Sequence, residues 1–172
     1  MTAMRAMVLD APRRPLVMRE RPVPAPGPGE ALIAVAACGV CRTDLHLVDG
    51  ELPDPTLPVV PGHEIVGRVL ATGAGVEGLR TGDRVGVPWL ASTCGRCRYC
   101  AGARENLCES ARYTGYTRDG GYATHALADA RYVLKLPDRY DDVRAAPLLC
   151  AGLIGYRAYA MAGPGRALGL WG

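Results

Sequence analysis

The sequence lacks several features that would define a function class. Its 172 residues contain no phenylalanine, so tyrosine and tryptophan supply all of the aromatic surface. No run approaches the roughly 20 apolar residues of a membrane span, and the N-terminus has no sustained apolar stretch of the kind found in secretory signals. The formal net charge of +3 is too small to indicate a surface for nucleic acid or membrane. We therefore expect a cytoplasmic chain with neither nucleic acid nor membrane as a partner.

A dinucleotide-binding fingerprint is also missing. The segment GAGVEG at 73–78 has a similar glycine spacing and follows an apolar stretch. The next residues, LRTGDRVGV, return to a strand-like pattern, whereas the phosphate-binding turn has to open a helix. The segment is therefore interpreted as a turn.

Short apolar or alternating stretches, separated by Gly/Pro clusters, indicate a mainly β fold. The expected strands lie at 5–10, 15–21, 30–40, 63–73, 83–89, 122–128 and 132–136. From residue 141 the chain becomes rich in Ala and Leu, and Pro147 separates a short first turn from a helix at 148–162. GPG ends that helix and a strand is expected at 166–171. The order predicts a β-barrel or sandwich that leads into an α/β unit.

Four of the seven cysteines form a dense motif, C-x2-C-x2-C-x7-C. Four thiolates suit a closed tetrahedral zinc site, which would hold together a loop that has little core of its own. A surface loop with free cysteines and a redox C-x-x-C pair are the alternatives, and the regular fourfold spacing disfavours both. The predicted structural zinc ligands are Cys94, Cys97, Cys100 and Cys108.

A second, dispersed set of residues predicts a catalytic metal. Cys41, His63 and Cys150 are three ligands, the number that leaves zinc a fourth position for water or substrate. Glu64 lies next to His63 and could approach the metal, and Asp44 is a candidate acceptor for the other ring nitrogen of His63. Taken singly, each cysteine could be a small core residue and the histidine a turn residue. The combination favours the metal site.

The motifs GHEIVG, CGVCRTDLH, CGRCRYC with its later Cys, and PLLCAG together resemble the zinc-dependent medium-chain alcohol dehydrogenases. The resemblance implies a GroES-like, partly open β-barrel over residues 1–140, with a structural-zinc lobe at 92–112. Residues 141–172 would supply a helix and the first strand of a Rossmann domain that is otherwise absent. It also implies two zinc ions per subunit, NAD or NADP in the full-length enzyme, a homodimer or homotetramer, and a small alcohol or aldehyde as substrate.

The resemblance assigns roles to three further residues. Thr43 would contact the substrate oxygen and His46 would carry the alcohol proton outward. Alternatively, Thr43 caps the turn and His46 is a solvated helix residue. Trp89 is predicted to form one wall of the substrate pocket, or else to be an ordinary core aromatic, and Tyr116 and Tyr122 are weaker pocket candidates.

Two functional hypotheses follow. In the first, the chain is the catalytic-domain portion of an alcohol dehydrogenase and is inactive alone because the Rossmann domain is missing. In the second, it is a stand-alone zinc-binding GroES-like module without turnover, acting as a binding protein or a subunit of a split enzyme.

Overall fold

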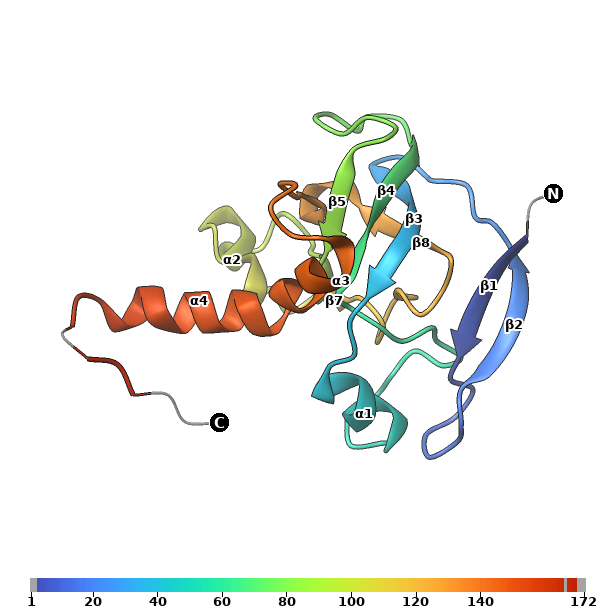
Figure 1. Ribbon diagram of the computed structural model, residues 1–172, viewed down its shortest axis with the longest axis horizontal. Coiled ribbons are helices and arrows are strands. Elements are labelled where there is room, and N and C mark those ends of the chain that lie inside the picture. The colour runs from blue at the N-terminus through green and yellow to red at the C-terminus, as the bar shows by residue number, and fades with distance from the viewer. Residues whose placement is uncertain (1–2, 166, 170–172) are drawn as a thin grey trace.

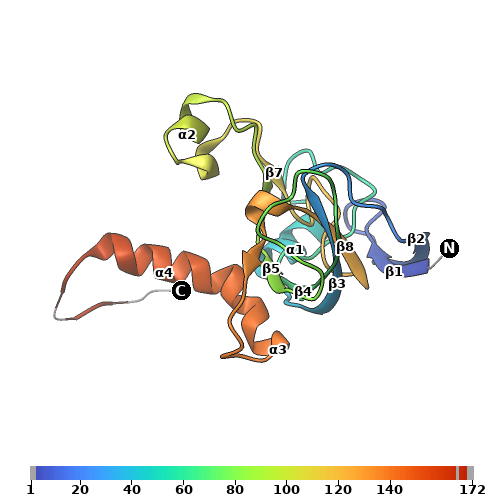
Figure 2. The ribbon, with the colours of Figure 1, turned by 90° about the horizontal axis from the view of Figure 1, so that it is seen from above.

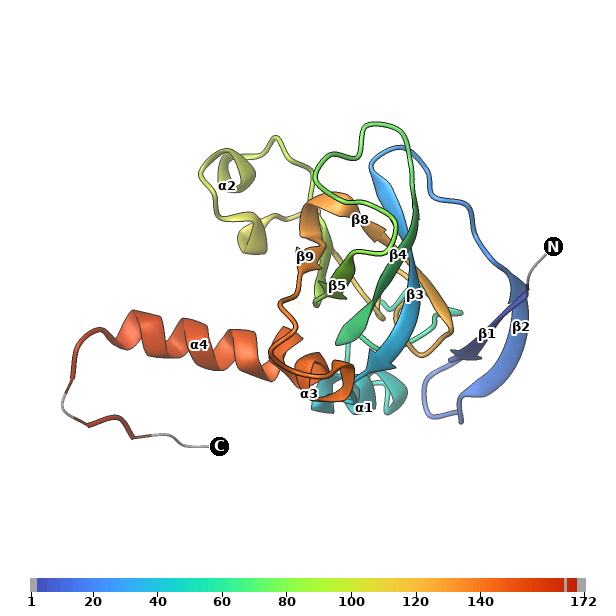
Figure 3. The ribbon, with the colours of Figure 1, turned by 45° about the horizontal axis from the view of Figure 1, so that its top comes forward.

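An antiparallel sheet of five strands forms the body of the fold in the computed structural model, which describes residues 3–165 and 167–169. The strand order is β8-β3-β4-β5-β9, so β8 and β9 form its edges. Figure 3 shows β3 and β4 side by side at its centre. The strands are β3 Glu30–Cys38, β4 Ile65–Thr72, β5 Arg84–Val87, β8 His125–Asp129 and β9 Leu134–Lys135.

The main core lies on one face of this sheet. Branched side chains suit the pleated surface of a strand, and Ile33, Ile65 and Val85 are each at most 1% exposed there. Alternation places Ala126 and Ala128 of β8 on the same buried face. The apolar alternation in the sequence therefore specifies which face of the sheet is covered.

Strands β1 (Ala3–Val8) and β2 (Val17–Pro22) form an antiparallel ribbon that is linked to the five-stranded sheet. The backbone amide of Met7 donates to the carbonyl of Tyr122 at 2.8 Å, and the amide of Thr124 donates to Arg5 at 2.9 Å. The amide of Val35 in β3 donates to Thr124 at 3.0 Å. The segment before β8 thus joins the ribbon to β3, which confirms the predicted mainly β, GroES-like architecture.

A separate lobe stands away from the sheets, as Figure 2 shows for α2. The lobe begins after β6 (Leu90–Ser92) and ends at β7 (Arg112–Tyr113), which pairs with β6. It contains only the short helix α2 (Arg98–Ala101) and the 3-10 turn η1 (Glu105–Leu107). The lobe has almost no apolar core of its own.

The remaining helices are α1 Arg42–Val48, α3 Asp142–Ala145 and α4 Ala151–Ala162, with 3-10 turns η2 Ala130–Tyr132 and η3 Ala146–Leu149. Of these helices, the sequence predicted the last one, and its expected start needs a correction. The expected start of the last helix at 148 is wrong, because Cys150 has φ −128° and ψ −79° and interrupts the helix. Leu149 packs on Val66 of the sheet, so the break fixes the direction in which Cys150 points.

Helix α4 projects away from the β-sheets (Figure 1) and leaves large apolar side chains exposed, among them Ile154, Tyr156 and Met161. No single helix in the described part of the chain is long and apolar enough to cross a membrane, although Asp142–Leu149 and Ala151–Ala162, bent by 52°, meet the length and composition criteria as a pair. Of the strand expected at 166–171, residues 167–169 adopt no regular structure and the rest lie outside the described residues.

Candidate metal centres

The four cysteines of the lobe converge on one point. Their Sγ atoms all lie within 4.8 Å of one another. The Sγ···Sγ separation is 3.6 Å for Cys97 and Cys100, 3.6 Å for Cys108 and Cys94, and 3.9 Å for Cys94 and Cys100. A zinc ion with sulfur ligands at about 2.3 Å requires edges of about 3.8 Å in a regular tetrahedron. The sulfur positions therefore have the dimensions of a tetrahedral site.

Hydrogen bonds lower the pKa of two of these thiols, Cys94 and Cys100. The amides of Arg96 and Cys97 hydrogen-bond to Cys94 and lower the pKa of its thiol to about 6. The hydroxyl of Thr93 is the main cause of a lowered pKa at Cys100. Gly95 has φ +71°, a conformation that glycine adopts without strain, and so turns the chain between the first two cysteines.

The dispersed set also meets, between the sheet and the helix break. Ligand atoms of Cys41, His63, Glu64 and Cys150 lie within 4.8 Å of one another. The Sγ atoms of Cys41 and Cys150, which are 109 residues apart, are separated by 3.7 Å. This distance again equals the tetrahedral edge expected for zinc, about 3.8 Å.

The Asp44 carboxylate forms hydrogen bonds with several residues of this cluster and around it. Its Oδ1 lies 3.2 Å from Nδ1 of His63 and accepts from the amide of Gly62 at 3.1 Å. Its Oδ2 accepts from the amide of Cys41 at 2.9 Å and from the hydroxyl of Tyr122 at 3.0 Å. Because Nδ1 of His63 faces Asp44, Nε2 is the ring nitrogen left to face the sulfur atoms.

Burial and charge shift the pKa values in this cluster. Burial alone would raise the pKa of Asp44, but the hydrogen bonds from His63 and the Cys41 amide outweigh it, so the net shift is downward. Burial alone would lower the pKa of His63, but the Asp44 carboxylate outweighs it and the net shift is upward. Burial raises the pKa of Cys150 to about 12, with a further contribution from the neighbouring Cys41 sulfur. Burial also raises the pKa of Glu64. Cys150 would therefore become a thiolate beside Cys41 only with a cation bound between the two sulfur atoms.

Two glycines make room for the side chains packed around this cluster. A Cβ on Gly39 would lie 1.8 Å from Oε2 of Glu64, so only glycine lets this 4% exposed carboxyl group occupy its position. Gly62 has φ +96°, and a Cβ there would lie 2.5 Å from the ring of Tyr122 and 2.8 Å from Sγ of Cys38. Cys38 itself is half-buried and packs against the main core of the sheet.

The structure places both Thr43 and His46 on helix α1. The N-cap of α1 is Cys41, and Asp44 provides the carboxylate that caps its amide, so Thr43 is not the capping residue. The Oγ1 atom of Thr43 lies 3.8 Å from Sγ of Cys41, at the rim of the cluster. His46, three residues further along the helix, is partly exposed and pairs through Nδ1 with Glu51.

Trp89 is part of an aromatic stack. Its ring meets His63 edge-on, with centroids 5.0 Å apart and an interplanar angle of 75°. Tyr113 and Tyr116 stack on Trp89 with centroids at 5.0 and 5.8 Å. The half-buried indole therefore adjoins the metal cluster.

Sequence reasoning missed several supporting residues. Tyr122 was a pocket candidate, yet its hydroxyl donates to Asp44. Tyr113 was not considered, although it extends the stack on Trp89. Thr93 was missed as well, and its position immediately before Cys94 is a signal that could have found it.

Comparison with known proteins identifies the class to which this fold and these clusters belong. The family described as "Alcohol dehydrogenase GroES-like domain" matches residues 27–138. The chain belongs to this family.

Individual relatives extend the similarity over almost all of the chain. An alcohol dehydrogenase of Geobacillus stearothermophilus is 45% identical over 172 residues, which cover 98% of this chain and 51% of the relative. The cobalt- and zinc-bound thermostable alcohol dehydrogenase of Pyrobaculum aerophilum superposes with a TM-score of 0.84 at 33% identity, covering 94% of this chain and 49% of that one. Acetophenone reductase of Geotrichum candidum, in complex with NAD, gives a TM-score of 0.83 at 34% identity, with 94% and 48% covered. The chain thus spans about half the length of the curated relatives it matches.

Proposed function

We propose that residues 1–172 are the catalytic-domain portion of a zinc-dependent alcohol dehydrogenase. The complete enzyme would oxidise an alcohol reversibly to an aldehyde or ketone by transferring a hydride to NAD or NADP. The observation that carries the proposal is the convergence of Cys41, His63 and Cys150, with the two sulfurs 3.7 Å apart. Three ligands of this kind leave zinc one open position, as catalytic sites require.

The donor set fits zinc in charge as well as in size. Two thiolates and a neutral imidazole balance the charge of Zn²⁺, so a buried net cation is avoided. Bound zinc would act as a Lewis acid that lowers the pKa of the alcohol. Asp44 would keep the proton on Nδ1 of His63 and orient the ring, because its own pKa is lowered and it stays ionised at neutral pH. Glu64, buried beside the three ligands, would adjust the local charge.

Helix α1 provides the proposed proton path. Thr43 and His46 are three residues apart and therefore lie on the same side of this helix. The hydroxyl of Thr43, beside Cys41, would accept the alcohol proton as it gives its own proton onward, and His46 would release a proton to solvent with Glu51 as its partner.

Trp89 is proposed as one wall of the substrate pocket. Its contact with His63 places the indole next to the reacting centre, and the stack with Tyr113 and Tyr116 would hold its plane fixed. A flat apolar wall suits a small apolar alcohol or aldehyde.

The lobe would carry a second, structural zinc ion on its four cysteines. A closed four-sulfur site has no position for substrate, and the lobe has almost no core to hold its shape without a metal. We therefore propose two zinc ions per subunit.

The nicotinamide cofactor would need residues beyond those in this chain. Within residues 3–165 and 167–169, the strands of all three sheets pair antiparallel, whereas a Rossmann sheet is parallel. We propose that residues 1–172 alone bind metal without oxidising an alcohol. A homodimer or homotetramer in the cytoplasm is proposed for the complete protein, and the seven free cysteines of residues 1–172 suit a reducing compartment.

A chimera tests the proposal. Residues 1–172 would replace the matching half of the Geobacillus enzyme, to which they are 45% identical. We expect the zinc-containing chimera to reduce NAD or NADP in the presence of a primary or secondary alcohol. The chimera with His63→Ala should lose this activity. The unfused chain is expected to hold about two zinc ions. A folded, zinc-loaded chimera without turnover would contradict the proposal and favour a stand-alone binding module.

A further inference from the structure

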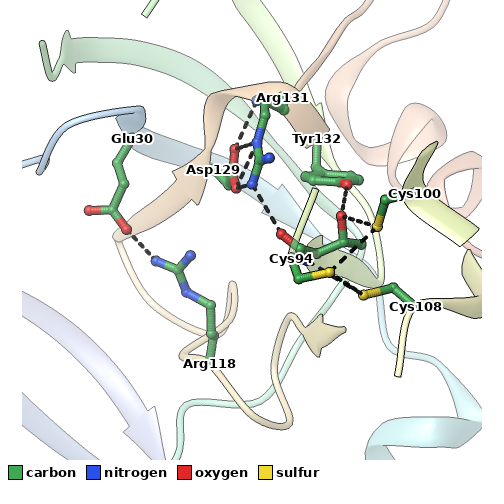
Figure 4. Close-up of polar contacts among 9 residues, drawn as sticks. Glu30, Cys94, Cys100, Cys108, Arg118, Asp129, Arg131 and Tyr132 are labelled. Atoms are coloured by element: carbon green, nitrogen blue, oxygen red, sulfur yellow. Dashed lines mark hydrogen bonds and ion pairs between the residues drawn. The ribbon is translucent and has the colours of Figure 1, made fainter. Parts of the chain in front are cut away.

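Two hydroxyl groups, those of Thr93 and Tyr132, connect the four-cysteine lobe to the main sheet. Thr93, 8% exposed, lies between β6 and Cys94. Its Oγ1 atom is 3.5 Å from Sγ of Cys100 and 2.6 Å from Oη of Tyr132. Tyr132 ends the 3-10 turn η2, which leads from β8 to β9 of the main sheet. Figure 4 shows Tyr132 and Cys100, with Cys94 and Cys108 below them in this view.

Metal coordination would fix the direction of both hydrogen bonds. A cysteine that binds zinc is a thiolate and can only accept a hydrogen bond. The single proton of the Thr93 hydroxyl would then point to the Cys100 sulfur, so Tyr132 must donate its own proton to Oγ1 of Thr93. In this series of hydrogen bonds, Tyr132 donates to Thr93 and Thr93 donates to Cys100. Linked hydrogen bonds of this kind strengthen one another.

The backbone of Thr93 is held from the same 3-10 turn. Nη2 of Arg131 donates to the carbonyl of Thr93 at 3.4 Å. Asp129 in turn fixes Arg131, with its carboxylate accepting from Nη2 at 2.6 Å, from Nε at 3.0 Å and from the backbone amide at 3.1 Å (Figure 4). Consecutive residues 131 and 132 thus hold both the carbonyl and the hydroxyl of Thr93.

A hollow gives access to Cys100 at the same place. This hollow, about 480 Å³ in volume, is lined by Thr93, Gly95, Cys100, Glu105, Arg131 and Tyr132. It is large enough for a competing metal ligand to approach Cys100. The hydroxyl of Thr93 therefore contacts the sulfur at which ligand exchange would begin.

We propose that Thr93 and Tyr132 are positioning residues that keep Cys100 in the coordination shell and set the rate at which the lobe releases its metal. The inference rests on the proposed function in one respect, namely that the four cysteines bind zinc. It adds two residues, Thr93 and Tyr132, that control metal release without being metal ligands themselves.

The test measures zinc release from the 172-residue chain to a chromogenic chelator. Cys150→Ala serves as the background in every sample, so that the other metal site does not contribute. Removal of a hydrogen-bond partner of a metal ligand typically weakens the site 10- to 100-fold, so we expect Thr93→Val to release zinc about 10-fold faster or more. Tyr132→Phe, which leaves the inner hydroxyl in place, should give a smaller increase of about threefold.

Two controls separate the hydroxyl from packing. Thr93→Ser keeps the hydroxyl and should restore slow release. Thr114→Val removes an equally buried hydroxyl that donates to the carbonyl of Pro88, away from the sulfur atoms, and should release zinc at the parent rate. With Co²⁺ in place of Zn²⁺, the thiolate charge-transfer band should change in Thr93→Val and not in Thr114→Val.

Each outcome decides between the alternatives. Equal release from the parent and Thr93→Val would overturn the inference, and so would a Thr93→Ser variant as fast as Thr93→Val. If Thr93→Val fails to fold, Tyr132→Phe decides, because its change lies outside the lobe. A parent chain that binds no metal at the four cysteines would overturn the proposed structural zinc site, and the inference with it.

Discussion

Nδ1 of His63 lies 3.2 Å from Oδ1 of Asp44, and the two side chains are 1% and 5% exposed. A buried carboxylate in this position can orient the imidazole and select which ring nitrogen carries the proton. Asp44 also accepts hydrogen bonds from the amides of Cys41 and Gly62. The same carboxylate thus joins the segments that carry two of the proposed metal ligands.

Asp44→Asn should weaken zinc binding at Cys41, His63 and Cys150 by about 10- to 100-fold. The amide retains the size of the side chain but loses the charge that stabilises the Nδ1–H tautomer of His63. Competition with a chelator of known zinc affinity would measure the change. Asp119→Asn is the matched control, because Asp119 accepts from the amide of Val60 and pairs with Arg21 away from the cluster. Equal affinities of wild type and Asp44→Asn would contradict the role assigned to Asp44.

Cys150→Ala should remove one zinc ion and leave the other. Cys150 is one of the three proposed ligands in its cluster, whereas the lobe has its own four sulfurs. Metal analysis should give about one zinc ion per chain in this variant, against about two in wild type. Cys108→Ala is the complementary variant and should lose the zinc ion of the lobe. If both metals disappear from a Cys150→Ala protein that remains folded, the two sites are not independent.

The parts of the structure that the sequence predicted are those encoded locally. The four lobe cysteines lie within fifteen residues, so their spacing alone indicated a common site. Cys41 and Cys150 are 109 residues apart, and their meeting was inferred from the combination of metal-binding residue types and from the resemblance, not from any local period. The contact of Tyr122 with Asp44 spans 78 residues and depends on how β1, β3 and the segment before β8 pair. Such a contact follows from tertiary packing, which hydrophobic periodicity does not specify.

Asp129→Asn should lower the free energy of unfolding at neutral pH by about 1–2 kcal/mol, because its hydrogen bonds to Arg131 lose their charge. Burial alone would raise the pKa of Asp129, but Arg131 outweighs it and the net shift is downward. The stabilisation is therefore complete above the ordinary aspartate pKa of about 4 and is lost as the pH falls through the lower, folded value.

Urea unfolding of wild type and Asp129→Asn at several pH values would measure this difference. The gap between the two proteins should narrow as the pH falls below about 4. Since acid removes metal from both proteins alike, only the gap is informative. A gap that stays constant with pH would mean that the charge of Asp129 contributes nothing.

Gly62→Ala should destabilise the protein by about 3 kcal/mol or more, because backbone strain at positive φ and steric overlap of the new Cβ with Tyr122 act together. The added Cβ would lie 2.5 Å from the ring of Tyr122, and φ at this position is +96°. Gly75→Ala is the matched control, with φ +76° and no atom within 4 Å of the added Cβ, so it carries only the backbone cost of about 1 kcal/mol. Chemical unfolding measures both variants. Because Tyr122 donates to Asp44, we also expect Gly62→Ala to weaken zinc binding at His63 while Gly75→Ala leaves it unchanged. Equal destabilisation by the two substitutions would show that the contact with Tyr122 relaxes without cost.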